Sequence, residues 1–544
     1  MAQAAVPPAR PTPSPLHPGA LWQPGTPAMP GPDSDSDSSR DSRDLPQAPR
    51  REQLPDAVDH FLGQLLSGLQ TRNIPQIHTL YEDTFNKLTD KHYKTQRWPN
   101  VDRVKEDVSA EPLFLILYQE LYYRHVFARL QPTFEDRRRA WENYCKLLDL
   151  IIDDLSTGED LTVALPPQWV WDLLDEFIYH YQTYCNFRNK AAKKQAEKEI
   201  LEIKENPEVF GTPKVLNYLH QLIHNSRIKE YLKDIENTKG ATGGPYTDET
   251  TRLFGYFGLM QLLRMHSLLA DYHLAMQTIE SIDFDAEVPL FYKIPACHVT
   301  LYYYMGFAYL MLRRYVDAIK TFSDILVFLS KTSGVNSLSY QYDQMVKKQD
   351  QMYALLLVCL ALCPRPVDES LEKTMRDKHG EKQGRLQRGE ELCFEELFIY
   401  ACPKFISAAL PDFDRAENFN PNEAHQRQLH LFLQEVKEQQ FLPRIGSYMK
   451  LYTAIKTSKL AQLCEMDEEG LRDQLMCVMH KTKQRVRHCG SPLDGEHQLC
   501  SEVEFYLDGD MVHINAQRVE RPHSEVFLEQ ILKFQDLLRK MGKA

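Results

Sequence analysis

The sequence predicts a mostly α-helical protein. We expect a right-handed, tetratricopeptide-like helical-repeat solenoid that ends in a winged helix with a small β-hairpin, and then a C-terminal helix. Three observations predict it: apolar residues recur at helical spacing over several hundred residues, a tetratricopeptide-like pattern of small and aromatic residues occurs twice, and strand-like alternation around an Asp-Gly turn is confined to the region near residue 505.

The first 53 residues are expected to form a disordered tail. Residues 1–50 hold 12 of the 32 prolines, and an Asp/Ser tract follows from residue 33. Such a segment has too few apolar side chains to offset the entropy of ordering. Ser34, Ser36 and Ser38 lie in acidic contexts that suit an acid-directed kinase, although a solubilising tail is the simpler interpretation.

Helical periodicity begins at about residue 55, and we assign residues 54–298 to an N-terminal helical-repeat region. The periodic positions are Leu62, Leu65, Leu66 and Leu69, and then Leu113, Leu117, Leu121 and His125. Residues 169–184 repeat the pattern directly after Pro166 and Pro167, where a helix can begin.

A second helical part, residues 299–440, carries the clearer copy of the repeat. The small residues Gly306 and Ala318 allow two antiparallel helices to approach closely, and aromatic residues fill the groove between them. The predicted packing set is Tyr302, Gly306, Tyr309, Ala318 and Phe322. A weaker copy, with Leu259, Leu263, Ala275 and Ile279, lies 43 residues earlier.

Residues 441–518 are expected to form the winged helix. We expect helices at residues 445–455, at residues 458–464 and after Asp467, a possible N-cap. Val503, Phe505 and Leu507 then alternate with polar residues before the Asp508-Gly509 turn, which is a strong hairpin signal. A final amphipathic helix, within residues 519–544, places Phe527, Ile531, Phe534 and Leu538 on one stripe.

This winged helix is poorly suited to read duplex DNA. The N-terminus of its third helix carries Asp467, Glu468 and Glu469, which DNA phosphates would repel. The basic cluster Lys481, Lys483, Arg485 and Arg487 lies at the opposite end, where it suits the helix dipole or a solvated face. RNA contact through these four residues is kept as a secondary hypothesis.

Composition and motifs give no support for an enzyme. The 544 residues carry a net charge of −12, which argues against a general nucleic-acid coat. Phosphate-binding-loop, zinc-protease and nucleophile-elbow motifs are absent. His488, Cys489, His497 and Cys500 match no common zinc spacing. We therefore expect no catalytic residue, no cofactor and no metal.

The same sequence features predict a cytoplasmic protein that does not span a membrane. The 11 cysteines are an odd number spread along the chain, which favours reduced thiols over a disulfide framework. The longest apolar run, residues 352–363, has 12 residues, whereas a bilayer span needs about 20. We expect this run to form a buried helix.

A helical-repeat solenoid closed by a winged helix resembles the PCI family, which builds the scaffolds of the proteasome lid, the COP9 signalosome and eukaryotic translation initiation factor 3. Several stretches between residues 55 and 540 are similar to the subunit L family of that initiation factor. They are residues 114–128, 169–182, 262–272, 302–319, 395–407, 450–455 and 502–514. The Pro/Ser/Asp-rich tail departs from the Tyr/Asp-rich start of that family.

The resemblance implies a non-catalytic subunit that docks beside other subunits of the factor, K and E among them. It implies contact with the small ribosomal subunit and mRNA through the complex, with the wing pairing edge to edge and the last helix joining a shared bundle. The expected interface side chains are Val503, Phe505, Val512, Ile514, Phe527, Ile531, Phe534 and Leu538. Two alternatives are a PCI scaffold of another complex and an RNA-binding winged-helix protein; the last helix could also fold back onto its own winged helix.

Overall fold

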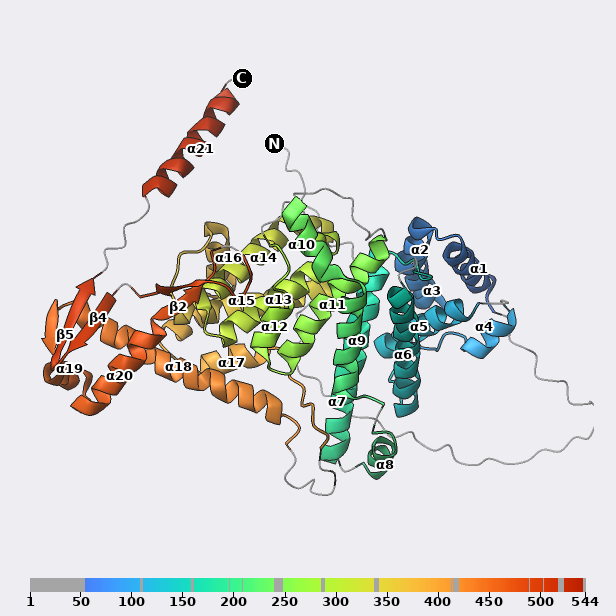
Figure 1. Cartoon of the computed structure of the whole chain (residues 1–544), viewed down its shortest axis with the longest axis horizontal. Helices are drawn as coiled ribbons and strands as arrows, with labels where there is room; N and C mark the ends of the chain where they lie inside the picture. Colours follow the sequence, from blue (N-terminus) through green and yellow to red (C-terminus); the bar gives the residue numbers. More distant parts are fainter. Residues whose placement is uncertain are drawn as a thin grey trace, which may run out of the picture. The chain divides into compact units, whose positions relative to one another are not determined.

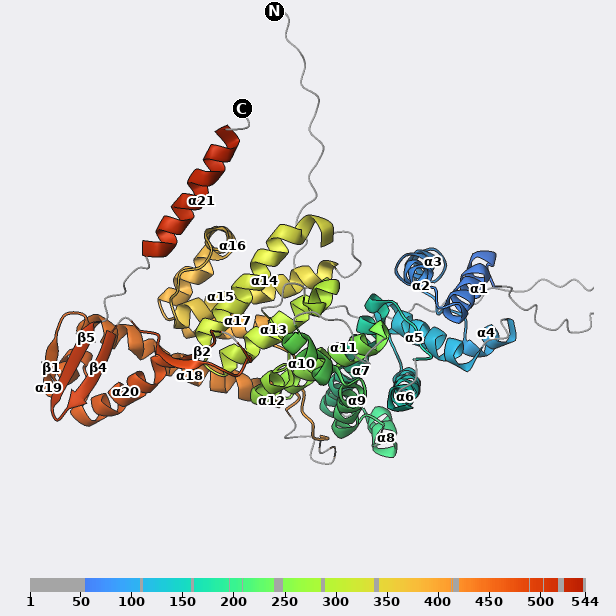
Figure 2. The same ribbon diagram turned by 45° about the horizontal axis from the view of Figure 1, so that its top comes forward.

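A computed structural model describes residues 54–541 with short gaps, and Figures 1 and 2 show its elements from two directions. The gaps are residues 108–110, 158–160, 195, 208, 239–247, 285–288, 337–341, 412, 414–419, 489, 502 and 517–522. The expected phosphorylation sites Ser34, Ser36 and Ser38 lie outside the described residues. The predicted fold class, a helical solenoid with a winged helix near the C-terminus, is confirmed.

The first part of the described chain is entirely helical. Its elements are α1 (Asp56–Gln70), α2 (Ile74–Thr79), the π-helical turn η1 (Leu80–Thr84), α3 (Phe85–His92), α4 (Val101–Asp107), α5 (Pro112–Arg129), α6 (Phe134–Thr157), α7 (Pro167–Lys194) and α8 (Glu197–Glu205). The segments predicted from apolar spacing lie in α1, α5 and α7. Trp141 of α6 stacks on Phe177 of α7 with ring centroids 4.8 Å apart, so large aromatic rings fill the space between these helices.

Three helical hairpins follow in a common register. They are α9 (Thr212–Asn225) with α10 (Ile228–Thr238), α11 (Glu249–Leu268) with α12 (Tyr272–Thr278), and α13 (Pro295–Met311) with α14 (Tyr315–Asn336). Each hairpin turns at a residue with positive φ, namely Arg227, Ala270 and Arg313, and these positions are 43 residues apart. The repeat therefore has one copy more than the sequence pattern indicates.

The close contact between α13 and α14 depends on the absence of a side chain at Gly306. A Cβ built on Gly306 would lie 2.5 Å from the Phe322 ring, which is itself fully buried. Tyr309 and Ala318 are buried at the same helix pair, and Tyr302 is half-buried beside them. The structure thus places all five residues of the predicted packing set on α13 and α14.

Replacing Gly306 by Ala should destabilise the fold by about 1–3 kcal/mol, because the added methyl group must displace the Phe322 ring. Chemical denaturation of the full chain measures the loss. Gly63→Ala in α1 is the matched control: nothing lies within 4 Å of its added Cβ, so better helix propensity should leave stability unchanged or raised. Equal destabilisation by both changes would contradict this packing model.

Four helices lead from the repeats to the winged helix: α15 (Tyr342–Leu362), α16 (Glu369–Gln387), α17 (Glu391–Ala401) and α18 (Glu423–Met449). The short 3-10 helix η2 (Leu290–Lys293) precedes α13. The apolar run 352–363 falls in and directly after α15, and most of its side chains are buried. It is thus a core helix, as its length predicts.

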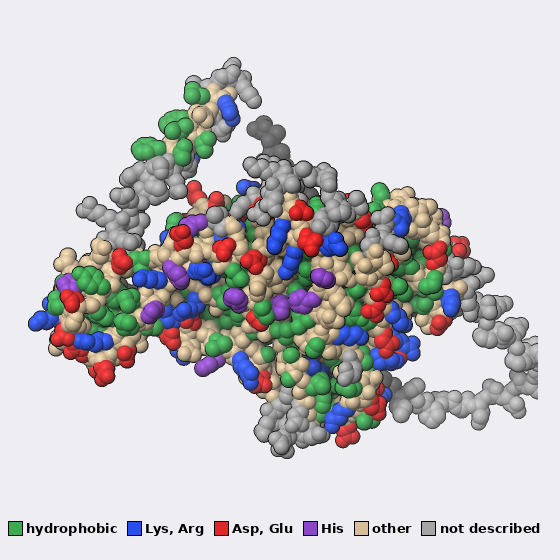
Figure 3. Space-filling model, viewed as in Figure 1, with side chains coloured by type: hydrophobic (Ala, Val, Ile, Leu, Met, Phe, Trp, Pro, Cys, Tyr) green, Lys and Arg blue, Asp and Glu red, His purple; other side chains and the backbone are tan. Residues whose placement is uncertain are grey.

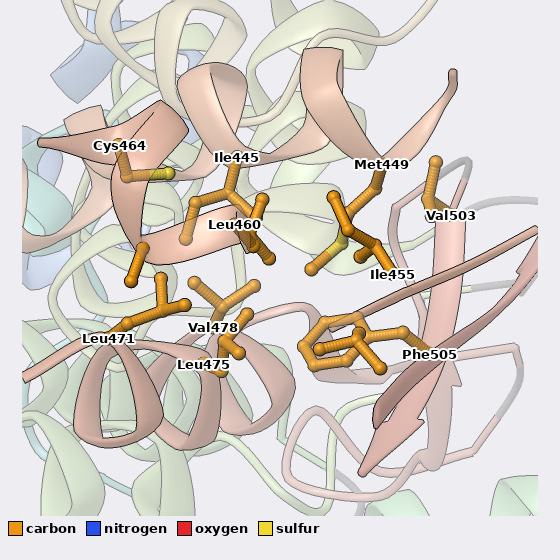
Figure 4. Close-up of a cluster of buried hydrophobic side chains, with 12 residues drawn as sticks. Ile445, Met449, Ile455, Leu460, Cys464, Leu471, Leu475, Val478, Val503 and Phe505 are labelled. Atoms are coloured by element: carbon orange, nitrogen blue, oxygen red, sulfur yellow. The ribbon is translucent and has the colours of Figure 1, made fainter. Parts of the chain in front are cut away.

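The winged helix contains the end of α18, β1 (Ala454–Lys456), α19 (Thr457–Cys464), α20 (Glu468–Lys481), β4 (Val503–Asp508) and β5 (Met511–Ala516). The three strands form an antiparallel sheet in the order β1-β5-β4. Figure 4 shows the shared core, where Ile445, Leu460, Leu475 and Phe505 point toward one another from α18, α19, α20 and β4. The Asp508-Gly509 hairpin is confirmed, with Asp508 opposite Met511.

Two sequence predictions in this region are wrong. The helix expected at residues 445–455 is the end of α18, which stops at Met449, and Ile455 lies in β1 opposite Val512. The second error is the prediction that the hairpin near residue 505 contains all the β-strands of the protein. β2 (Lys483–Val486) and β3 (Glu496–Leu499), which lie between α20 and β4 in the sequence, form a separate two-stranded sheet. The reason is visible in β2, where Gln484 and Val486 are buried and alternate with exposed basic residues.

Candidate functional site: the winged helix, its junction and the C-terminal helix

The β2–β3 hairpin attaches the winged helix to the helical repeats. β2 contacts α14, and the loop between the two strands reaches Arg314 at the turn of the third repeat. Gly495, at the end of that loop, has a φ of +146°, and an added Cβ there would lie 2.6 Å from the carbonyl oxygen of Val486. A glycine is therefore required for the loop to close against β2.

Arg314 is the centre of this junction. Its side chain is 7% exposed and forms an ion pair of 2.7 Å with Asp317. The guanidinium also donates to three successive backbone carbonyls, at 3.0 Å to Pro492, 3.1 Å to Leu493 and 2.7 Å to Asp494. Because these acceptors satisfy a buried cation, the hairpin loop and the repeat stabilise each other.

Further polar contacts join the same two regions. The Tyr309 hydroxyl donates to the carbonyl of Pro492 at 2.8 Å, and the Arg487 amide donates to Asp317 at 3.0 Å. The side-chain oxygen of Gln484 accepts from the amide of Tyr315 at 3.1 Å, at the N-terminus of α14. Burial raises the pKa of the Asp317 carboxyl, while the facing Arg314 guanidinium opposes that rise.

The four basic residues of the RNA hypothesis do not lie on one accessible surface. Lys481 is the last residue of α20, and its side chain is 5% exposed. Its ammonium group pairs with Glu435 at 2.7 Å and with Glu438 at 2.5 Å, so it is already bound to two carboxylates within the fold. Arg487 is half-buried, and its guanidinium lies 5.3 Å from the centroid of the Phe284 ring.

Lys483 and Arg485 are exposed on β2, and their neighbours are basic. Together with Arg313, His480 and His497 they line a hollow of about 260 Å³. In Figure 3, Lys, Arg and His side chains gather over β2 and the adjoining helices. Sequence reasoning placed these residues at a helix end and did not bring them together with Arg313.

The four hairpin side chains expected at a subunit interface belong to the core of the winged helix in this structure. Val503, Phe505 and Val512 are buried in its core, and Ile514 packs against them. Because side chains alternate across a strand, the outward positions are others, such as Tyr506, which is 58% exposed and stacks on His513.

The expected stripe on the last helix is exposed. Helix α21 (His523–Met541) carries Phe527, Ile531, Phe534 and Leu538, with exposed fractions of 65%, 50%, 62% and 67%. Leu528 and Leu532 widen the apolar face, and hydrophobic side chains are visible along α21 in Figure 3. Four such residues on one helix form a face that typically packs against another apolar surface.

The acidic N-terminus of α20 serves the fold. Asp467 caps the helix by accepting the Gly470 amide at 3.0 Å, and Glu468 accepts the Thr457 hydroxyl. Within the described ranges, no group of three or more His, Cys, Asp or Glu side chains could hold a metal ion, and Cys489 lies outside those ranges. Among the residues placed by the structure, no helix combines the length and apolar character of a membrane span.

Replacing Arg314 by Met should loosen the β2–β3 hairpin, because Asp317 and three carbonyls lose their shared donor. We expect a loss of about 3 kcal/mol, the usual scale for breaking one side of a buried pair, and faster amide hydrogen exchange across residues 483–499. Arg313→Met is the control: its side chain is 53% exposed, and the ion pair that it forms with Glu435 is 3.9 Å long. Similar exchange in both variants would show that Arg314 does not fasten the hairpin.

Comparison with known proteins identifies the family. The family model described as RNA polymerase I-associated factor PAF67 matches residues 136–534. Proteins named eukaryotic translation initiation factor 3 subunit L are similar over most of the chain. The one from Nematostella vectensis is 41% identical over 90% of this chain and 93% of its own length. Those from Danio rerio and Homo sapiens are 41% and 40% identical over 85% of this chain, and over 81% and 83% of their own lengths. The chain therefore belongs to the subunit L family of eukaryotic translation initiation factor 3.

Proposed function

We propose that this chain is a non-catalytic scaffold subunit of translation initiation factor 3 that acts in the cytoplasm. It takes part in assembling the preinitiation complex on the small ribosomal subunit and in recruiting mRNA, through protein–protein contacts with neighbouring subunits, K and E among them. The observation that carries the proposal is the sequence identity of 41%, over 90% of the chain, to a protein named as a subunit of that factor.

The exposed face of α21 supports this mode of action. A helix whose apolar side chains are half to two-thirds exposed gains free energy when a second apolar surface covers them. In a multi-subunit factor, a bundle formed with helices of neighbouring subunits supplies that surface. The carboxylate of an Asp introduced into the same face would then have to be buried without a partner, which is costly.

A second surface available to a neighbouring subunit is the outer edge of β4. Among the described strands, β4 pairs with β5 on one side only, because the sheet order is β1-β5-β4. Its backbone can therefore add a strand from another chain. This contact uses backbone groups, so it is compatible with the buried positions of Val503 and Phe505.

Phe527→Asp and Phe534→Asp should each release the chain from the factor without unfolding it, since both side chains are exposed in the free subunit. The measurement is affinity purification of the tagged full-length chain, with quantitative mass spectrometry of the co-purified subunits. We expect at least a tenfold loss of subunits K and E. Gln530→Asp is the matched control: it adds the same charge to α21 outside the stripe and should retain both subunits.

Normal recovery of initiation factor subunits by Phe527→Asp and Phe534→Asp would contradict the shared-bundle contact. Recovery of proteasome-lid or signalosome subunits by the unmodified chain would assign it to another PCI complex. If these variants keep the other subunits but no longer sediment with the ribosome, the contact of α21 is with the ribosome.

Direct RNA contact is a second candidate function, favoured by the convergence of Lys483 and Arg485 with Arg313 and two histidines. Lys483→Glu combined with Arg485→Glu should reduce RNA crosslinking of the purified complex at least fivefold while sparing assembly, because both side chains are exposed. Lys481 is left unchanged, since its ion pairs with Glu435 and Glu438 support the fold. Unchanged crosslinking would remove this candidate.

A further inference from the structure

The helical repeats contain a cavity that the proposed scaffold function does not use. It has a volume of about 620 Å³ and lies among α7, α11, α13, α15 and the segment that follows α17. This volume is within the range of sites that hold small molecules, about 300–1,000 Å³. Trp171, Tyr303 and Tyr304 form apolar walls, and all three are at least nine-tenths buried.

Positive charge dominates the lining of this cavity. It includes four basic side chains, Arg264, Lys347, Lys348 and Lys404, against a single carboxylate, Asp175. Arg264 already forms an ion pair with that carboxylate, with 2.5 Å between its Nη1 and the Asp175 Oδ1. None of the three lysine ammonium groups forms an ion pair with any residue the structure describes, so the cavity holds an uncompensated cationic cluster.

Lys348 is the most constrained of these groups. Its Nζ lies 3.4 Å from the centroid of the Tyr303 ring and 5.4 Å from that of Tyr304, which makes the aromatic faces its neighbours. The Tyr303 ring is held in place by its hydroxyl, which donates to the carbonyl of Ala401 at 2.7 Å. The ammonium is therefore held at the cavity wall by aromatic faces, and no carboxylate that the structure describes forms a direct ion pair with it.

The environment of Lys348 makes a bound anion favourable. Burial and the positive charges of Arg264, Lys347 and Lys404 lower the pKa of the Lys348 ammonium to about 7, and the Asp175 carboxylate opposes that change. An anion placed among these groups relieves their mutual repulsion, and the low local dielectric strengthens each attraction. Buried charges are ordinarily paired, and a bound anion supplies the ion-pair partner that the Lys348 ammonium does not find among the described residues.

We propose that this cavity binds a small molecule that carries several phosphate groups. Three lysines that line one open cavity match a compact, multiply charged anion, because phosphate oxygens accept several charge-assisted hydrogen bonds at once. A singly charged anion leaves most of the positive charge uncompensated. The volume suits a compact molecule, whereas an acidic peptide segment needs an extended groove.

The test is calorimetric titration of the full chain at constant ionic strength with inositol hexakisphosphate, ATP and inorganic phosphate. Inositol hexakisphosphate or ATP should bind with a Kd at least tenfold below that of inorganic phosphate. Tighter binding of inositol hexakisphosphate would indicate a cyclitol ligand, and tighter binding of ATP would indicate a nucleotide. Lys347→Glu with Lys404→Glu should weaken that binding at least tenfold, since both side chains are exposed at the cavity.

Two further variants make the result decisive. Lys373→Glu with Lys378→Glu applies the same charge change to exposed positions on α16 outside the cavity, and should bind as the unmodified chain does. Lys348→Met should lose at least tenfold in affinity. Its thermal midpoint without ligand should stay the same or rise, because removing the cost of burying the ammonium offsets the lost contact with the Tyr303 ring.

Three results would overturn the proposal. They are no binding of any phosphorylated probe by the unmodified chain, equal weakening in the cavity and control double variants, and binding of a ten-residue polyglutamate peptide as tight as that of the phosphorylated probes. The last would assign the cavity to an acidic protein segment. Because no readout involves other subunits, failure here leaves the scaffold function intact, and failure of the scaffold function leaves this site intact.

Discussion

The contact between Arg314 and the β2–β3 hairpin joins the two halves of the architecture. A buried guanidinium is costly to desolvate unless its donors are satisfied, and here Asp317 and three successive carbonyls satisfy it. Arg314 directly follows Arg313, the positive-φ residue that turns the third repeat. The geometry of the repeat therefore determines where the hairpin attaches. A winged helix without this contact would be connected to the repeats chiefly through α18.

The distribution of apolar side chains separates fold from function. The hairpin residues Val503, Phe505 and Val512 complete the winged-helix core together with α18, α19 and α20. The apolar face of α21 has no comparable cover in the described structure, since Phe527 and Phe534 are both more than half exposed. One set of side chains thus stabilises the subunit itself, and the other is available to a partner. This division is what the proposed scaffold role requires, because such a subunit must fold and still retain free energy for assembly.

The sequence predicted the elements whose signal is local and periodic. Apolar spacing identified the helices around Leu62, Leu117 and Trp169, and the Asp508-Gly509 pair identified the wing, since a positive φ at a turn favours glycine. The prediction for residues 445–455 failed because the apolar pattern runs through a helix end into a short strand. β1 has three residues, and its pairing with β5, about 57 positions onward, leaves no local signal.

The candidate sites were less predictable, because they depend on contacts between distant segments. The alternation of Gln484 and Val486 with basic residues was a readable strand signal, but the nearby α20 made a helical continuation equally plausible. Lys481 resembled its exposed neighbours in sequence, and only the fold shows its ion pairs with α18. The cationic cavity draws lysines from α15 and from the segment after α17, which no spacing rule connects.

The size of the particle that contains this chain in cell extract tests the proposed scaffold role most directly. Native mass spectrometry of the gently purified, tagged full-length chain measures it without disrupting the assembly. We predict that the chain is recovered in a stoichiometric particle with other subunits of translation initiation factor 3. A free monomer of 63.4 kDa as the main species would contradict it.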